Sequence, residues 1–109
     1  MTEYFKTYDQ FVRFSPEKMA KVTLFQSEKL LLGLNCLEPG QSQSLHLHDN
    51  QDKFYYVIEG TGEFTIGDET KSAASGVTVW APAGVPHGVT NTGSARLVLL
   101  IGIAPFPDA

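Results

Sequence analysis

Short runs of apolar and β-branched residues, separated by turn residues, fill nearly all of the chain after residue 20. Runs of roughly four to eight such residues, bounded by Gly, Pro, Asn and Asp, predict strands, and close spacing of many such runs is typical of an antiparallel sandwich or barrel. The predicted strands cover residues 22–25, 30–37, 45–48, 53–58, 63–66, 71–74, 77–80, 87–90 and 97–103. The chain therefore predicts an all-β domain with no long helix after residue 20.

The first 20 residues follow a different pattern. Four aromatic residues recur at a spacing that suits one face of a short helix or an extended strap, namely Tyr4, Tyr8, Phe11 and Phe14. Ser15 followed by Pro16 predicts one helical turn, with the serine as N-cap. We expect a single domain over residues 1–109, in which a helical or aromatic arm, 1–20, precedes a barrel at about 21–104. An aromatic arm and apolar sheet faces that a small core leaves uncovered predict a homodimer.

The composition limits which binding partners and which cellular compartment are expected. The formal net charge of −4 offers no basic footprint, so we expect no nucleic-acid partner. The longest apolar run, Leu97 to Ile101, is too short to span a bilayer, and no secretory signal pattern opens the chain. Cys36 is the one cysteine, so it has no intrachain disulfide partner, and we expect the protein to reside in the reducing cytoplasm. The Cys36 side chain is expected to be a small buried apolar group.

The three histidines form the main chemical signal. His46 and His48 are one residue apart in a predicted strand, so their side chains share a face. His87 lies in a separate predicted strand. Three neutral imidazoles suit a divalent transition metal (Fe, Zn, Ni, Mn or Cu), and three protein ligands leave coordination positions open, as in catalytic sites. The alternative is that each histidine is an ordinary packed or surface residue.

Two spaced motifs contain these histidines. The first reads Gly40, five residues, His46, Leu47, His48, four residues, Lys53, six residues, Gly60. The second reads Gly76, five residues, Pro82, Ala83, Gly84, two residues, His87, three residues, Asn91. Together they resemble the two signature motifs of the cupin family, and the resemblance covers about residues 30 to 103. The second motif matches at every specified position and the first at every position but one.

The resemblance implies a double-stranded β-helix, the small jelly-roll barrel of the cupins. It also implies that His46, His48 and His87 converge on a metal inside that barrel. The motif glycines fall at turns where a positive φ or a close backbone approach is needed, and Asn91 is suited to hold a turn through its side chain. Because one such fold hosts many reactions, the resemblance indicates the fold more strongly than the activity.

Lys53 is the departure from the family pattern, since a glutamate ligand usually stands there. A protonated lysine has no acceptor lone pair and repels a cation. Three arrangements stay open: a three-histidine site without a carboxylate, a site in which a bulge turns Asp52 inward, and no tight metal. Gln51 shares the parity of Lys53 and is a further candidate for an oxygen ligand. Lys53 is alternatively one half of a structural ion pair.

A metal held by neutral imidazoles keeps its double charge, and an inward ammonium adds to it. Such a site favours an anionic chelating ligand such as a carboxylate, an enolate or a thiolate. We therefore expect a small-molecule metal site of dioxygenase, isomerase or cyclase type, and the alternatives are a non-catalytic ligand-binding or sensor module and a metal-free structural cupin. Tyr55 and Trp80 are expected at the pocket or, by ordinary burial tendencies, in the core. No catalytic residue is assigned.

Overall fold

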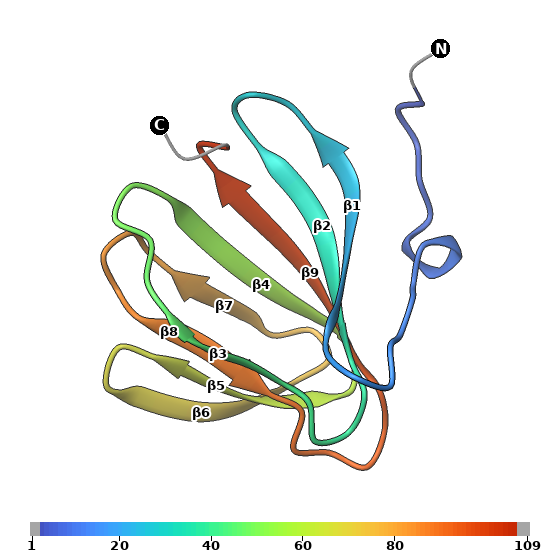
Figure 1. Ribbon diagram of the computed structural model, residues 1–109, viewed down its shortest axis with the longest axis vertical. Helices are drawn as coiled ribbons and strands as arrows, with labels where there is room; N and C mark the ends of the chain where they lie inside the picture. The colour runs from blue at the N-terminus through green and yellow to red at the C-terminus, as the bar shows by residue number, and fades with distance from the viewer. Residues whose placement is uncertain (1–2, 107–109) are drawn as a thin grey trace.

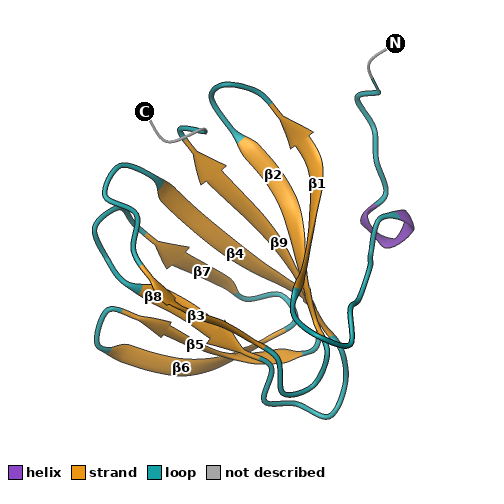
Figure 2. Ribbon diagram, viewed as in Figure 1, coloured by secondary structure: helices purple, strands orange, loops and turns teal. Residues whose placement is uncertain are grey.

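The computed structural model describes residues 3–106 as two antiparallel sheets that face each other across a shared core (Figures 1 and 2). One sheet has the strand order β1-β2-β9-β4-β7, and the other has the order β3-β8-β5-β6. The strands are β1 Ala20–Gln26, β2 Leu31–Leu37, β3 Ser42–His46, β4 Asp52–Glu59, β5 Thr61–Ile66, β6 Glu69–Ala74, β7 Thr78–Ala81, β8 His87–Thr90 and β9 Leu97–Ala104. This topology confirms the predicted all-β double-stranded β-helix. Residues 1–2 and 107–109 of the predicted domain lie outside the described residues.

Every predicted run forms a strand, and the third run differs most from its prediction. The sequence predicts a strand over 45–48, whereas β3 spans Ser42–His46. The pairing of β3 with β8 is irregular between Gln43 and His46, which marks a bulge. A bulge inserts a residue without a cross-strand partner and changes which side chains face inward, so simple alternation fails in this strand.

Strand β2, which lies between β1 and β9, is buried on both faces, as its largely apolar sequence predicts. Leu37 points into the core between the sheets, where it joins residues of both sheets such as Tyr55 and Phe64. Leu34 and Cys36 point to the other side, into a second cluster. That cluster is covered by the aromatic residues of the N-terminal arm, so the arm completes the outer face of the larger sheet. Cys36 is a buried apolar residue, as expected.

The arm is mostly extended, and the helical turn predicted at Ser15 is wrong. Residues 16–18 form a bend, and the Ser15 hydroxyl accepts a 3.3 Å bond from the Glu17 N–H. The Ser15 carbonyl, which would begin a helix, accepts a bond from the Gln41 side chain at 2.7 Å. The helix found within residues 3–106 is one 3₁₀ turn at Tyr8–Gln10. No helix there has the length and apolar character to cross a membrane.

Glycines at positive φ allow the sharp turns between strands, as predicted for Gly40, Gly60, Gly76 and Gly84. Gly60 is the tightest of these because a Cβ there would collide with the backbone oxygen of Arg96. Asn91 holds a turn as expected: its side-chain oxygen accepts from the Gly93 N–H at 3.0 Å, and its amide donates to the backbone oxygens of Leu37 and Ala95. These contacts fix the hairpin ends next to the strands that carry the histidines.

Candidate functional site

The structure brings the three histidine rings together on the inner side of the smaller sheet. His46 on β3 and His87 on β8 are direct cross-strand partners, and their ring centres are 4.2 Å apart. His48 follows the end of β3, and its ring centre lies 5.2 Å from that of His46 and 6.1 Å from that of His87. Antiparallel pairing of β3 with β8 therefore supplies the convergence that the sequence spacing alone left as an expectation.

Hydrogen bonds to backbone carbonyls set the tautomers of two of these rings. The Nδ1 atom of His46 lies 2.8 Å from the Ser44 oxygen, and that of His87 lies 3.0 Å from the Val85 oxygen. Because a carbonyl only accepts, these contacts assign the proton to Nδ1 and leave the lone pair on Nε2. Metal-binding histidines commonly have their second nitrogen held in this way.

The Nε2 atom of His87 is buried and has no hydrogen-bond partner among residues 3–106. The residue is only 1% exposed, so water does not readily satisfy this acceptor. A buried polar atom without a partner is costly, and in native proteins it calls for an explanation such as a bound ion. Burial lowers the pKa of His87 and of His46, and the Lys53 charge lowers both pKa values further. Both rings are thus held in the neutral form that coordinates metals.

The donor set fits a transition metal, although the side chains are not closed around one. Within residues 3–106, no group of three or more His, Cys, Asp or Glu side chains is already arranged to hold an ion. With metal–nitrogen bonds of about 2.0 Å, three imidazoles on one ion have ring centres roughly 4.5–5.5 Å apart. The observed separations of 4.2, 5.2 and 6.1 Å bracket that range. His48, half-buried and beyond the end of β3, is the ring that must move closer to His87.

Lys53 on β4 is buried beside the histidines, with 4% of its surface exposed. Its Nζ atom lies 3.4 Å from Oε1 of Gln43 and 4.5 Å from the centre of the Tyr55 ring. Burial, together with the charge of Lys21, lowers the pKa of Lys53 to about 8. In the part of the chain that the structure describes, Lys53 forms no ion pair with a carboxylate. The structural ion pair considered from the sequence is therefore not formed.

The two other candidates for an oxygen ligand bind backbone groups instead. Asp52 is exposed, and its Oδ1 atom accepts a bond from the Ala83 N–H at 2.9 Å. Gln51 is buried, and its side-chain amide donates to the Pro105 oxygen at 3.0 Å. Neither side chain lines the cavity that His46 and His48 border. Within residues 3–106 the site thus has histidines and a lysine, and no carboxylate lines the cavity beside them.

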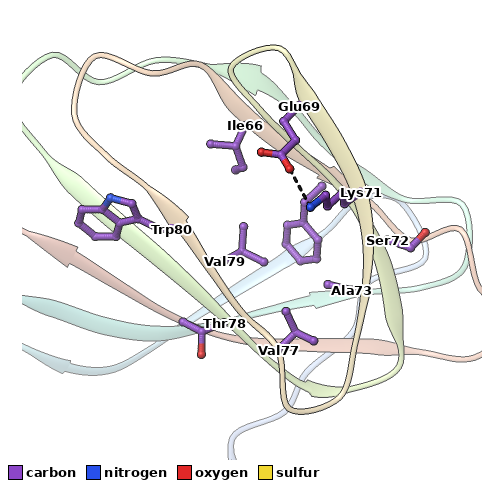
Figure 3. A pocket seen from close by; sticks show the side chains of 10 residues that line it. Ile66, Glu69, Lys71, Ser72, Ala73, Val77, Thr78, Val79 and Trp80 are labelled. Atoms are coloured by element: carbon purple, nitrogen blue, oxygen red, sulfur yellow. Dashed lines mark ion pairs between the residues drawn. The ribbon is translucent and has the colours of Figure 1, made fainter.

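Of the two predicted pocket aromatics, only Tyr55 lies at the site. Tyr55 is fully buried, and its hydroxyl donates to Gln43 Oε1 at 2.9 Å. Trp80 is 56% exposed and borders a separate apolar cavity of 330 Å³ along β6 and β7 (Figure 3). The register explains this difference: Tyr55 pairs with Val79, so Val79 shares its inward face and Trp80 takes the other.

Sequence reasoning missed Gln43 and Asn35. Alternation places Gln43, three residues before His46, on the opposite face, but the β3 bulge turns both inward. Asn35 is 1% exposed, and its Nδ2 atom is buried without a hydrogen-bond partner. Asn35 could have been singled out from the sequence, because it is the one polar residue in the run from Leu30 to Leu37.

Two cavities with shared lining residues border Gln43 and Lys53. The first, of 380 Å³, is lined by Lys21, Gln43, Ser44, Leu45, His46, His48, Lys53 and Ile103. The second, of 220 Å³, shares Lys21, Gln43, Lys53 and Ile103 with the first, and Asn35 also lines it. No aspartate or glutamate within residues 3–106 lines either cavity. Neutral nitrogen ligands and buried positive charge suit an anionic small molecule.

Known proteins share this architecture. The chain superimposes on the crystal structure of TT1209 from Thermus thermophilus with a TM-score of 0.91 and 43% identity, covering 94% of this chain and 98% of that one. It is 31% identical over 86 residues to uncharacterized protein SCO3923 of Streptomyces coelicolor, covering 79% of this chain and 81% of the relative.

Some relatives have names that describe an activity. An oxalate-binding protein of Thermotoga maritima is 31% identical over 64 residues, which is 59% of this chain and 53% of that protein. Mannose-1-phosphate guanylyltransferase 2 of Escherichia coli O157:H7 is 28% identical over 75 residues, or 69% of this chain, which spans only 16% of that enzyme. The family described as Cupin domain (Cupin_2) matches residues 33–102, so this chain belongs to the cupin family.

Proposed function

We propose that His46, His48 and His87 bind one divalent transition metal and that the site takes an anionic small molecule as substrate. The observation that carries this proposal is the buried Nε2 atom of His87, which lacks a partner while Nδ1 is held by Val85. The rings of the other two histidines lie next to it. These features support the proposal because a metal satisfies a buried imidazole lone pair that nothing else in the described chain reaches.

The residues around the histidines have complementary tasks. When bound, the metal supplies Lewis acidity to a coordinated oxygen. The Ser44 and Val85 carbonyls orient two of the imidazoles, and the Lys53 ammonium supplies a positive charge beside them. The buried Tyr55 ring and the sheets around it keep water from the inner end of the site. Dioxygenase-, isomerase- and cyclase-like reactions on an anionic chelating substrate all suit this arrangement.

A non-catalytic small-ligand binding or sensor module is the second candidate. It is favoured by Lys53, which stands where the resemblance implies a glutamate ligand, and by the Thermotoga relative named as an oxalate-binding protein. An oxygen-uptake screen with diketones, thiols and catechols on metal-loaded protein separates the two. Turnover of any of these supports the enzyme, whereas ligand binding without turnover supports the module.

Metal content tests the proposed site. Protein purified after growth in medium supplemented with iron, zinc, nickel, manganese and copper is expected to hold close to one equivalent of metal by elemental analysis. Metal affinity for histidine sites falls as pH is lowered, because protons compete for the imidazoles. The measurement is therefore made at neutral pH without chelators. Less than about a tenth of an equivalent would favour the metal-free structural cupin.

We also propose a homodimer, as predicted from the aromatic arm. Tyr4 and Phe5 are 77% and 91% exposed, and Leu45 and Leu47 are 57% and 50% exposed, which leaves apolar surface for a second copy. Light scattering at micromolar concentration is expected to give the mass of two chains, and a monomer mass would contradict this. The cytoplasmic location and the expected lack of nucleic-acid and membrane partners stay predictions.

A further inference from the structure

We propose that the cavity lined by Asn35 and Lys53 binds the carboxylate of a small organic acid on the Lys53 ammonium, with the Asn35 amide donating to the same molecule. The inference deepens the proposed function. It rests on that function only for the position of the acid, which is next to the histidines. It assigns a recognition site built from β2 and β4, separate from the three imidazoles. It also commits the ligand to a class, a small carboxylic acid.

The first observation is a buried positive charge without a negative partner. Lys53 is 4% exposed, and its one hydrogen bond is a long 3.4 Å contact with Gln43 Oε1. That oxygen already accepts a shorter 2.9 Å bond from the Tyr55 hydroxyl. An ammonium group has three N–H donors, so Lys53 keeps donor capacity. Buried charges in proteins are normally paired, and a ligand carboxylate is the partner this charge lacks among residues 3–106.

The second observation is independent of Lys53. Asn35 lies on the apolar strand β2 and is 1% exposed, and its Nδ2 atom has no hydrogen-bond partner in the described part of the chain. Asn35 and Lys53 line the same cavity of 220 Å³. An amide donor that nothing in the described chain satisfies, at the wall of a small cavity, indicates a ligand that offers an acceptor. An ammonium with spare donor capacity and an amide without a partner among residues 3–106 thus line one cavity.

The third observation is the distribution of charge. The chain carries 12 acidic and 8 basic residues, yet no aspartate or glutamate among residues 3–106 lines the cavity next to Asn35 or the one next to His46. A third cavity, of 580 Å³, shares Lys21, Gln43 and Ser44 with the cavity next to His46, and no acidic residue of the described chain lines it. Four of the eight basic residues line this series, namely Arg13, Lys18, Lys21 and Lys53. Such a series attracts and guides anions.

A carboxylate fits better than a phosphate. Lys53 and Asn35 supply two donor groups, which match the two oxygens of one carboxylate group, whereas a phosphate has more oxygens to satisfy. Phosphate sites usually present several backbone N–H groups, often at a helix N-terminus, and the helix in residues 3–106 is the 3₁₀ turn at Tyr8–Gln10 in the arm. The volume of 220 Å³ admits a small acid. The chemistry therefore indicates a short mono- or dicarboxylate.

The test uses malonate as the probe and the full chain after removal of metal with a chelator. Calorimetric titration is made with malonate, with inorganic phosphate, and with malonamide, the neutral analogue of malonate. Malonate is expected to bind wild type, and Lys53→Met is expected to weaken binding by about tenfold or more, since charge-assisted hydrogen bonds are the strong ones. Asn35→Leu is expected to weaken it by about threefold to tenfold. Lys29→Met, at an exposed turn, is the matched control and is expected to bind as wild type does.

Several outcomes overturn the inference. Equal binding of malonate by wild type and Lys53→Met, absence of malonate binding to wild type, or equal affinity for malonamide each contradicts a carboxylate on Lys53. Phosphate binding tighter than malonate overturns the assignment of the class. Metal-free His87→Ala is expected to keep malonate binding, so this result is separable from the metal proposal. Malonate binding by a protein that takes up no metal would refute only the metal site, and a normal metal content without malonate binding would refute only this inference.

Discussion

Replacing His87 by alanine is expected to remove most of the bound metal and leave the barrel folded. The substitution deletes the buried Nε2 atom that lacks a partner, and it leaves His46 and His48 as a pair of ligands from one end of β3. Loss of even an outer-shell partner costs roughly 10- to 100-fold in metal affinity, so loss of a ligand is expected to cost about 100-fold or more. Metal equivalents by elemental analysis and a chelator-competition titration measure the change.

Thr90→Ala is the matched control for this experiment, because Thr90 lies on the same strand, β8, and its hydroxyl faces Ser42 rather than the histidines. It is expected to retain the metal content of wild type. Circular dichroism and thermal unfolding of both variants show whether the barrel persists. Full metal occupancy in His87→Ala would mean that His87 is not a ligand, and the unpartnered nitrogen would then need another explanation.

Replacing Lys53 by methionine is expected to stabilise the metal-free and ligand-free protein at pH 7. Burial lowers the pKa of Lys53 from 10.5 to about 8, which corresponds to an unfavourable contribution of about 3 kcal/mol for the charged form. Methionine has a similar length and no charge to bury, and replacing buried charges by apolar residues often stabilises. We expect the free energy of unfolding to rise by roughly 1–3 kcal/mol in urea titrations.

The difference in unfolding free energy between Lys53→Met and wild type depends on pH, because folding and proton binding to Lys53 are linked. Below about pH 8 both the folded and the unfolded wild-type chain carry the proton on Lys53, so the full penalty is present. Between about pH 8 and 10.5 the unfolded chain binds more protons than the folded chain, so wild-type stability rises with pH relative to Lys53→Met. The advantage of the variant therefore shrinks across this window and is largest at neutral pH.

The groups that face Lys53 support the assignment of this pH dependence to Lys53 itself. Burial raises the pKa of Tyr55, and burial lowers that of His46 and His87, so these three stay uncharged across the window. Lys21 is exposed and present in both proteins. Lys29→Met is the control and is expected to change stability by no more than about 0.5 kcal/mol. A Lys53→Met protein less stable than wild type at pH 7, or a difference that grows from pH 8 to 10, would contradict the prediction.

The two properties expected of Lys53 oppose each other. As a buried charge it lowers stability, and as a carboxylate partner it strengthens ligand binding. A residue that costs stability and gains binding is a common feature of functional sites. Lys53→Met is therefore expected to give a more stable protein that binds the carboxylate more weakly. Measuring both stability and binding in this one variant links the two experiments.

The sequence by itself determined the strands and the turns. Apolar runs and the turn residues between them predicted a strand near each of β1 to β9, because strand period and turn chemistry are local properties of the chain, and β3 was displaced most from its predicted range. The spacing of the two cupin motifs was enough to predict the family and the jelly roll. It also predicted that His46 and His87 would meet, which the pairing of β3 with β8 then provides.

The tertiary structure alone decided what surrounds the histidines. The bulge in β3 turns Gln43 inward, and the register of β7 turns Trp80 outward. The Ser15 carbonyl bonds Gln41, 26 residues away, instead of starting a helix. Lys53 and Asn35 share one cavity only because their strands, β4 and β2, flank β9 in the five-stranded sheet. Pairing between strands that are distant in the sequence determines these neighbours, whereas the local pattern determines only which face of a regular strand a residue takes. The class of the expected anionic ligand could therefore be named only once the tertiary structure showed which side chains lie together.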